Sequence, residues 1–264
     1  MSSRLGVRAR AAWKCVRLLI HIVTGLWTIA FVFPKLSAPQ KEERIRAWAL
    51  TLLARIGIKL TVVGEPPAHG PLLLAANHIS WLDIVVMLAA RYCRFVSKAD
   101  VRHWPLIGSL ARGAGTLFIE RESRRDAMRV VHHMAERLNA GDVLAIFPEG
   151  TTSDGVSLLP FHANLLQAAI ATNAPVLPVA LRFTDAATGE RSLAPCYIND
   201  DTLLGSIWRT LNAPPLCAIV TFGEPQFAYR RERRLWAADL RLVIEALRAG
   251  PVNPGVPSPL INAV

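Results

Sequence analysis

The sequence reads LLLAANHISWLDIVVMLAA from Leu72 to Ala90. Residues 72–76 are all apolar, which predicts a short strand buried on both faces of its sheet. A polar turn follows, and the mainly apolar stretch 81–90 is long enough for a helix. Because a strand of this kind needs helices on both faces of its sheet, the stretch favours an α/β fold.

The same alternation extends through most of the chain after Lys59. We expect strands at 60–63, 72–76, 95–97, 116–119, 143–147, 176–183, 195–198 and 218–222. We expect helices at 81–90, 105–112, 124–139, 163–172 and 202–211, and a last helix at about 232–247. The tail that begins at Gly250 is rich in proline and is expected to be loose. Alternating strands and helices predict a largely parallel central sheet flanked by helices.

Composition excludes some classes of protein. The chain has 264 residues, of which 52% are hydrophobic and only 19% are charged, which excludes wholesale disorder. Its formal net charge of +10 indicates an anionic partner: nucleic acid, a phospholipid surface or a phosphorylated small molecule. The four cysteines are far apart and form no CxxC pair, so we predict reduced thiols in a cytosolic compartment and no metal site.

The first 58 residues predict a segment that associates with membranes. Basic residues precede an apolar run over 18–33, which is shorter than the ~20 residues that cross a bilayer. A second helical pattern covers 42–56. Two such helices behind a basic flank are typical of an anchor that dips into the membrane or lies at its interface, with the N-terminus in the cytoplasm. A helical hairpin that covers the core and a secretory signal peptide are the alternatives.

His78 and Asp83 are the first candidate site residues. On one continuous helix their side chains would diverge by about 140°, so they can meet only if His78 lies in the turn and Asp83 in the first helical turn. A histidine oriented by a carboxylate can act as a general base near neutral pH. The alternative is structural, because Ser80 and Asp83 have the spacing of a helix capping box.

Three further blocks end or form predicted strands. Arg121 follows one strand and could bind phosphate through its planar guanidinium group, or pair with a neighbouring glutamate. Glu149, Gly150 and Thr151 follow another strand, either as a sharp turn that presents a carboxylate or as an ordinary turn. Residues 176–180 contain Pro178 and could equally be an edge strand.

Several common motifs are absent from the sequence. It contains neither a G-x-S-x-G elbow nor a phosphate-binding P-loop, which argues against an α/β-hydrolase and a P-loop nucleotidase. The arginine-rich stretch 230–234 has no known nucleic-acid module beside it, so we predict no nucleic-acid partner.

Together, the order and spacing of the four blocks resemble the glycerolipid acyltransferase family of the 1-acyl-sn-glycerol-3-phosphate acyltransferase type. The matching blocks are Asn77-His78-x4-Asp83 and the stretches 115–121, 147–151 and 176–180. Lys98 and the stretch 105–108 also match, whereas Glu120 stands where the family usually has aspartate. The resemblance covers roughly residues 60–222.

The resemblance implies transfer of a fatty acyl group from acyl-CoA or acyl-carrier protein to a lysolipid hydroxyl, without a cofactor or a metal. His78 would be the base and Asp83 would orient it. Arg121, with Lys98 as a weaker candidate, would hold the acceptor's phosphate. Glu149, Gly150 and Thr151 would shape the acceptor pocket, and Pro178 would help line it.

The domains implied are the membrane-associating helices at 1–58, the acyltransferase domain at 59–228, and a C-terminal helix with its tail at 229–264. The expected location is the cytoplasmic face of the inner membrane, and the expected acceptor is 1-acylglycerol-3-phosphate. Another lysolipid, such as lyso-ornithine lipid, and a non-catalytic lipid-binding protein are the alternatives.

Overall fold

The computed structural model describes residues 2–120 and 124–250. Within them the chain forms one seven-stranded sheet of β1 (Ile58–Val63), β2 (Leu72–Ala76), β3 (Arg94–Lys98), β4 (Leu117–Ile119), β5 (Val143–Ile146), β6 (Val176–Asp185) and β7 (Leu216–Phe222). Its order is β1-β7-β6-β2-β5-β3-β4, and all neighbouring strands are parallel except the pair β6 and β7. The predicted α/β fold with a largely parallel sheet is therefore confirmed.

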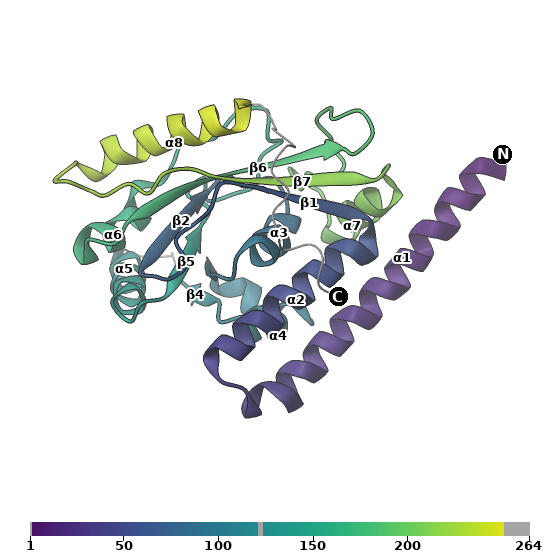
Figure 1. The fold of residues 1–264 in the computed structure, drawn as a ribbon, viewed down its shortest axis with the longest axis horizontal. Helices are drawn as coiled ribbons and strands as arrows, with labels where there is room; N and C mark the ends of the chain where they lie inside the picture. The colour runs from purple at the N-terminus through teal and green to yellow at the C-terminus, as the bar shows by residue number, and fades with distance from the viewer. Residues whose placement is uncertain (1, 121–123, 251–264) are drawn as a thin grey trace.

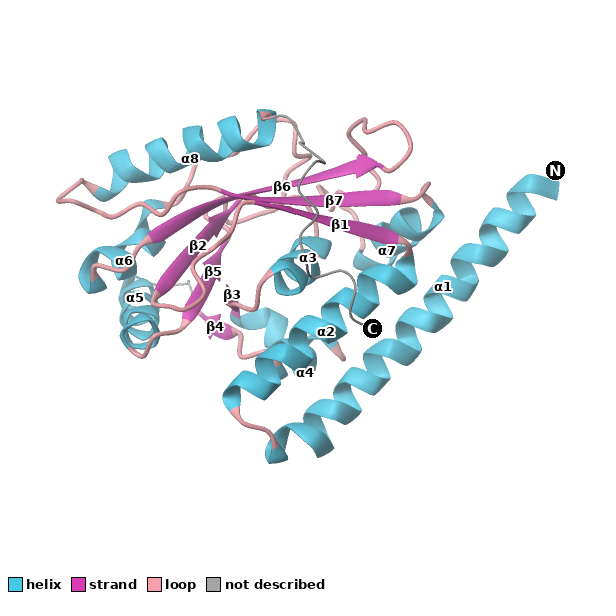
Figure 2. Ribbon diagram, viewed as in Figure 1, coloured by secondary structure: helices cyan, strands magenta, loops and turns pink. Residues whose placement is uncertain are grey.

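Helices cover both faces of this sheet (Figure 1, Figure 2). On one face lie α2 (Ala38–Ile56), α3 (Leu82–Ala90) and α7 (Leu203–Asn212), and on the other lie α5 (Arg124–Asn139), α6 (Gln167–Thr172) and α8 (Arg233–Ala249). A short helix, α4 (Ile107–Gly113), precedes β4. Successive residues of β2 point to opposite faces of the sheet. Leu74 packs into the core under α2, α3 and α7 (the first core), and Leu73 packs into the core under α5, α6 and α8 (the second core), as expected for a strand buried on both sides.

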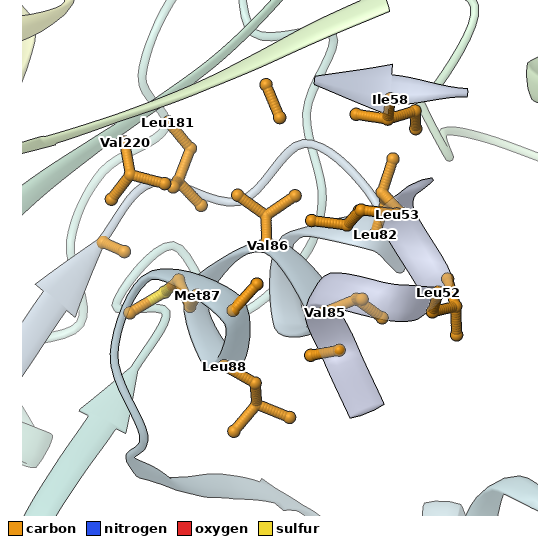
Figure 3. Close-up of a cluster of buried hydrophobic side chains, with 14 of the residues drawn as sticks. Leu52, Leu53, Ile58, Leu82, Val85, Val86, Met87, Leu88, Leu181 and Val220 are labelled. Atoms are coloured by element: carbon orange, nitrogen blue, oxygen red, sulfur yellow. The ribbon is translucent and has the colours of Figure 1, made fainter. Parts of the chain in front are cut away.

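The first core fixes the start of α3 beneath the sheet (Figure 3). Leu52 and Leu53 of α2 lie beside Leu82 and Val86 of α3, and the sheet contributes side chains such as Val220. Burial of each such side chain contributes roughly 1.5–3 kcal/mol to stability. This packing holds the turn between β2 and α3 in one position.

The N-terminal region is helical beyond its apolar run. Helix α1 (Ser2–Trp27) continues through a π-helical turn at Thr28–Val32 and a 3-10 turn at Phe33–Lys35. The helical stretch Ala9–Lys35 is long and apolar enough to cross a membrane, and only 22% of its most apolar window is buried. The run of 18–33 alone therefore underestimated the apolar length, because the helix extends on both sides of it.

Helix α1 is the outermost helix and lies along α2 (Figure 1). The rings of His21 and Trp48 stack with centroids 4.9 Å apart, and the Trp48 indole N–H donates to the carbonyl oxygen of His21 at 3.2 Å. A Cβ at Gly25 would lie 2.6 Å from the Trp48 ring, so the two helices approach closely at a residue that has no side chain.

Two sequence-based predictions are wrong. Residues 195–198 form no strand, because their backbone bonds to the turn after β2: the Ser80 hydroxyl donates to Pro195 O at 2.5 Å, and Tyr197 N–H donates to Ile79 O at 3.1 Å. The edge-strand interpretation of Pro178 also fails, because β6 lies between β7 and β2.

An interior strand tolerates Pro178 because the β6–β7 ladder is interrupted beside it. Pro178 O accepts from Gly223 N–H at 2.9 Å, and the next bonds on that side join Val176 to Gln226. The register changes by one residue between Val179–Phe222 and Val176–Gln226, and proline is tolerated inside a sheet at such an irregularity.

Candidate active site

The candidate site lies where the parallel strands end. His78 comes two residues after β2, and Phe147 and Glu149 directly follow β5. Lys98 ends β3, and Glu120 follows β4. Because these strands are parallel and adjacent, their carboxyl ends meet at one edge of the sheet, where ligands bind in open α/β folds.

His78 and Asp83 are in direct contact. His78 Nδ1 lies 2.8 Å from Asp83 Oδ2, with the Asp83 side chain completely buried and the His78 side chain 18% exposed. An ionised carboxylate can only accept a hydrogen bond, so Nδ1 carries the proton. The lone pair of His78 is then on Nε2, which is the nitrogen that can take a proton from a substrate.

Asp83 also holds the backbone of the turn that precedes α3. Its Oδ2 atom accepts from the backbone N–H groups of Ile79 at 2.6 Å and Ser80 at 2.9 Å. One carboxylate oxygen thus contacts His78 and accepts from Ser80 N–H, as a capping box would, although α3 begins at Leu82 with Trp81 as its N-cap and without a side-chain cap bond. The helix start fixes the carboxylate, and the carboxylate fixes the imidazole.

An aromatic pair fixes the plane of the imidazole. The Phe147 ring stacks on His78 at 3.9 Å between centroids and 6° between planes. Phe95 of β3 stacks behind Phe147 at 5.6 Å. The sequence predicted Phe147 as the last residue of a strand. In the structure β5 ends at Ile146 and the Phe147 ring lies against His78.

Glu149 stabilises the backbone of the turn between β2 and α3. Its Oε1 atom accepts from His78 N–H at 2.7 Å, and its Oε2 atom accepts from Leu159 N–H at 2.9 Å. Burial raises the pKa of Glu149, while these backbone hydrogen bonds oppose that rise. With one hydrogen bond to each oxygen, Glu149 positions His78.

The loop after Glu149 closes over the turn. Gly150 has φ of 74°, a conformation that favours glycine, and a Cβ there would lie 2.9 Å from the ring of His162. The backbone N–H of Ser153 donates to His78 O at 2.9 Å. Thr151 is exposed in this loop, and the Thr152 hydroxyl donates to Tyr197 O.

Asn77 was not predicted as a supporting residue. Its side-chain oxygen accepts from Leu181 N–H at 2.7 Å, and its side-chain amide donates to Leu181 O at 3.2 Å. This pair of bonds extends the sheet beyond β2 and fixes the residue before His78. The position of Asn77 in the first block was the available signal.

The remaining predicted site residues occupy different environments. Lys98 is exposed at the end of β3, at the same edge as His78. Pro178 is buried inside the sheet opposite Ala75, and its ring would be 3.0 Å from a Cβ at Gly223. Arg121 lies outside the described residues. The structure thus brings His78, Asp83 and Glu149 together.

The described part of the chain offers no metal centre, since residues 2–120 and 124–250 contain no group of three or more His, Cys, Asp or Glu side chains that could hold a metal ion. All four cysteines are free thiols, and burial raises the pKa of Cys93 to about 12. Nucleophilic catalysis by that thiol is disfavoured, because the thiolate is the reactive form.

Comparison with known proteins gives the family. The sequence model of the family described as "Acyltransferase" matches residues 59–182. The chain is 42% identical to the 1-acyl-sn-glycerol-3-phosphate acyltransferase of Neisseria meningitidis, over 65% of this chain and 67% of that protein. The chain belongs to the acyltransferase family.

Other relatives of this acyltransferase are named for a different acceptor. The chain is 39% identical to the lyso-ornithine lipid O-acyltransferase of Pseudomonas aeruginosa, over 77% of this chain and 80% of that protein. The crystal structure of the 1-acyl-sn-glycerophosphate (LPA) acyltransferase from Thermotoga maritima has the same fold, with a TM-score of 0.60. It is 19% identical, and the match covers 90% of this chain and 99% of that one.

Proposed function

We propose that this acyltransferase moves a fatty acyl group from acyl-CoA or acyl-carrier protein to the hydroxyl of a lysolipid. The observation that carries the proposal is the contact between His78 Nδ1 and Asp83 Oδ2, because it leaves Nε2 as a base. The His78 side chain is 18% exposed, at the edge of the sheet where the strands end.

The proposed reaction needs one proton shuttle. Nε2 of His78 takes the hydroxyl proton as the oxygen attacks the thioester carbonyl, and Asp83 stabilises the imidazolium ion that forms. The C–S bond then breaks, and the proton passes from His78 to the leaving thiolate. A thioester is already activated, so a positioned base, which typically contributes ~10²–10⁴-fold, addresses the step that is hard for an alcohol.

We propose 1-acylglycerol-3-phosphate as the acceptor, which would give phosphatidic acid. The Neisseria relative and the net charge of +10 support this choice. Arg121 and Lys98 are the proposed phosphate ligands. We propose that Glu149 and the neighbouring loop residues Gly150 and Thr151 shape the acceptor pocket, with Pro178 contributing through the sheet.

Lyso-ornithine lipid is the second candidate acceptor. The match to the Pseudomonas relative covers more of both chains than the match to the Neisseria relative. This acceptor has no phosphate, so phosphate ligands would matter less for it.

The test is thiol release from acyl-CoA by the solubilised protein with a panel of lysolipids. Wild type should turn over, and His78→Ala should lose at least about 100-fold in kcat. Turnover with a phosphate-free lysolipid alone would favour the second acceptor. Lipid binding without turnover, with either acyl-CoA or acyl-carrier protein and no effect of His78→Ala, would contradict the proposed reaction.

We further propose that the enzyme acts at the cytoplasmic face of the inner membrane. The apolar helical stretch Ala9–Lys35 supports membrane association. The basic residues before it would keep the N-terminus in the cytoplasm.

A further inference from the structure

Three arginines surround a cavity that the proposed reaction does not use. The cavity has a volume of about 150 Å³ and lies at the end of β6, and its lining includes Arg182, Arg191 and Arg248. Arg182 belongs to β6, Arg191 to the turn after it, and Arg248 to the last turn of α8. Segments far apart in the sequence thus bring three guanidinium groups to one place.

Two of these guanidinium groups are held in place by backbone carbonyls. Arg182 Nη1 donates to Arg248 O at 2.6 Å, and Arg248 Nη2 donates to the carbonyl oxygens of Gly155 and Val156. Arg248 is only 8% exposed. The Nε atoms of Arg182 and Arg248 are buried, and neither has a hydrogen-bond partner in the described residues.

Carboxylates act on this cluster without direct contact: within the described chain, Glu149 and Glu245 each raise the pKa of Arg248. None of the three guanidinium groups forms an ion pair there with a carboxylate. Asp154 is the only carboxylate among the described lining residues, and it is exposed and accepts from Val156 N–H instead. Burial lowers the pKa of Arg182 and of Arg248, and the charge of Arg191 lowers both further. Buried positive charge without an ion-paired carboxylate is unfavourable, so the cluster favours an anion.

The cavity adjoins the turn between β2 and α3, which contains His78. Ile79, which directly follows His78, lines it together with Gly155, and a Cβ at Gly155 would lie 3.1 Å from the Ile79 side chain. Glu149 acts electrostatically on Arg248, opposing the effect of burial on its pKa. An anion bound here would therefore lie next to the residues that hold His78.

We propose that Arg182, Arg191 and Arg248 form a phosphate-binding subsite for a substrate of the acyl transfer. The planar guanidinium group matches phosphate oxygens in pairs, and a cavity of this size suits one phosphate group. This assignment rests on the proposed function, in which either substrate can supply the phosphate: the lysolipid headgroup or the acyl donor. In the order of the sheet, the subsite and the end of β4, which Arg121 follows, lie on opposite sides of β2.

The first test measures phosphate binding without turnover. Thermal unfolding of the solubilised full chain is followed in rising inorganic phosphate, against sodium chloride at equal ionic strength. We expect the melting temperature of wild type to rise with phosphate and that of Arg191→Gln not to rise. Arg191 is the best position for the substitution, because it is exposed and its side chain forms no hydrogen bond to a backbone group in the described structure. Arg234→Gln, at an exposed arginine of α8, is the control for lost charge and should respond like wild type.

The second test identifies the substrate. If the lysolipid supplies the phosphate, Arg191→Gln should raise KM for 1-acylglycerol-3-phosphate about tenfold and leave KM for a phosphate-free lysolipid unchanged. If the donor supplies it, KM for acyl-CoA should rise about tenfold with either acceptor, and Arg191→Lys should restore part of the affinity.

Two results would overturn the subsite. One is equal stabilisation of wild type and Arg191→Gln by phosphate, and the other is loss of this stabilisation with every KM unchanged. If the chain has no turnover with any acceptor, a wild-type response to phosphate that Arg191→Gln loses would still establish the phosphate site, so failure of the proposed function is distinguishable.

Discussion

At the scale of single residues, the site depends on one carboxylate oxygen. Asp83 Oδ2 accepts from His78 Nδ1 and from two backbone N–H groups of the turn before α3. The same residue therefore supports the fold locally and, in the proposed reaction, the base. An asparagine at this position separates the two roles, because its amide oxygen can still accept from the backbone but carries no charge.

We predict that Asp83→Asn lowers kcat about 10²- to 10⁴-fold, because the imidazolium ion loses its counter-charge and Nδ1 its orientation. The unfolding free energy should fall by only about 1 kcal/mol, since the backbone bonds are kept. Steady-state kinetics and urea unfolding measure the two effects. His78→Ala combined with Asp83→Asn should be no slower than His78→Ala alone, and fully additive losses would contradict a coupled pair.

At the scale of elements, the loop after β5 requires a glycine for two separable reasons. Gly150 and Gly189 have nearly the same φ, 74° and 73°. A Cβ at Gly150 would contact the His162 ring at 2.9 Å, whereas a Cβ at Gly189 would have nothing within 4 Å. The two positions therefore separate backbone strain from crowding.

We predict that Gly189→Ala lowers the unfolding free energy by about 1–2 kcal/mol, which is the cost of placing an alanine in the left-handed backbone conformation. Gly150→Ala should lower it further and should also reduce kcat, because the loop positions Glu149 under His78. Denaturant unfolding and kinetics on both variants are the measurements. Equal losses of stability with unchanged kcat would show that the His162 contact has no role.

A second element, the segment 194–201, is held by α7 against the turn between β2 and α3. Arg209 Nε donates to Ala194 O at 3.1 Å, and the Arg209 guanidinium group bonds to both carboxylate oxygens of Asp201 at 3.0 and 2.8 Å. The hydrogen bond from Arg209 lowers the pKa of Asp201 from its ordinary 3.8 to about 2.

Because the folded pKa is depressed, the pair stabilises the fold above about pH 3.8 and loses this contribution as the pH falls towards 2. We predict that Arg209→Met raises the Asp201 pKa towards its ordinary value, with the hydrogen bond from Ile198 N–H still lowering it. An NMR titration of the Asp201 carboxyl measures this directly, with the Asp185 carboxyl as an internal reference. An unchanged Asp201 pKa in the variant would contradict the assignment.

Sequence patterns predicted the elements better than their long-range bonds. The uninterrupted apolar residues of β2 and the periodicity of α5 are local signals, and both elements have the predicted bounds. Residues 195–198 also have strand-like composition, but their backbone bonds go to Ser80 and Ile79, more than a hundred residues earlier. The hydrogen bond from His78 N–H to Glu149 Oε1 is equally non-local. Residue type and spacing indicated a site at these residues, but they did not predict this hydrogen bond.

At the scale of the whole molecule, α1 has two unlike sides. Ala11, Leu18 and His21 are buried, and α1 packs against α2 and α7. The opposite side exposes large apolar residues at helical spacing: Trp13, Val16, Leu19, Ile20, Val23, Trp27 and, in the following turn, Phe31. A continuous apolar face with tryptophans near both ends is typical of a helix that contacts lipid.

We predict that Leu19→Asn with Val23→Asn weakens binding to anionic vesicles about 100-fold, because two apolar side chains that together contribute about 3 kcal/mol no longer enter the lipid. Flotation with vesicles of mixed neutral and anionic phospholipid measures the partition coefficient. The matched control is Leu235→Asn with Leu242→Asn, since both leucines are equally exposed but lie on α8, across the sheet from α1. All four positions are exposed, so both variants should melt close to wild type. Equal binding of the two variants would show that charge, and not the apolar face of α1, holds the enzyme to the membrane.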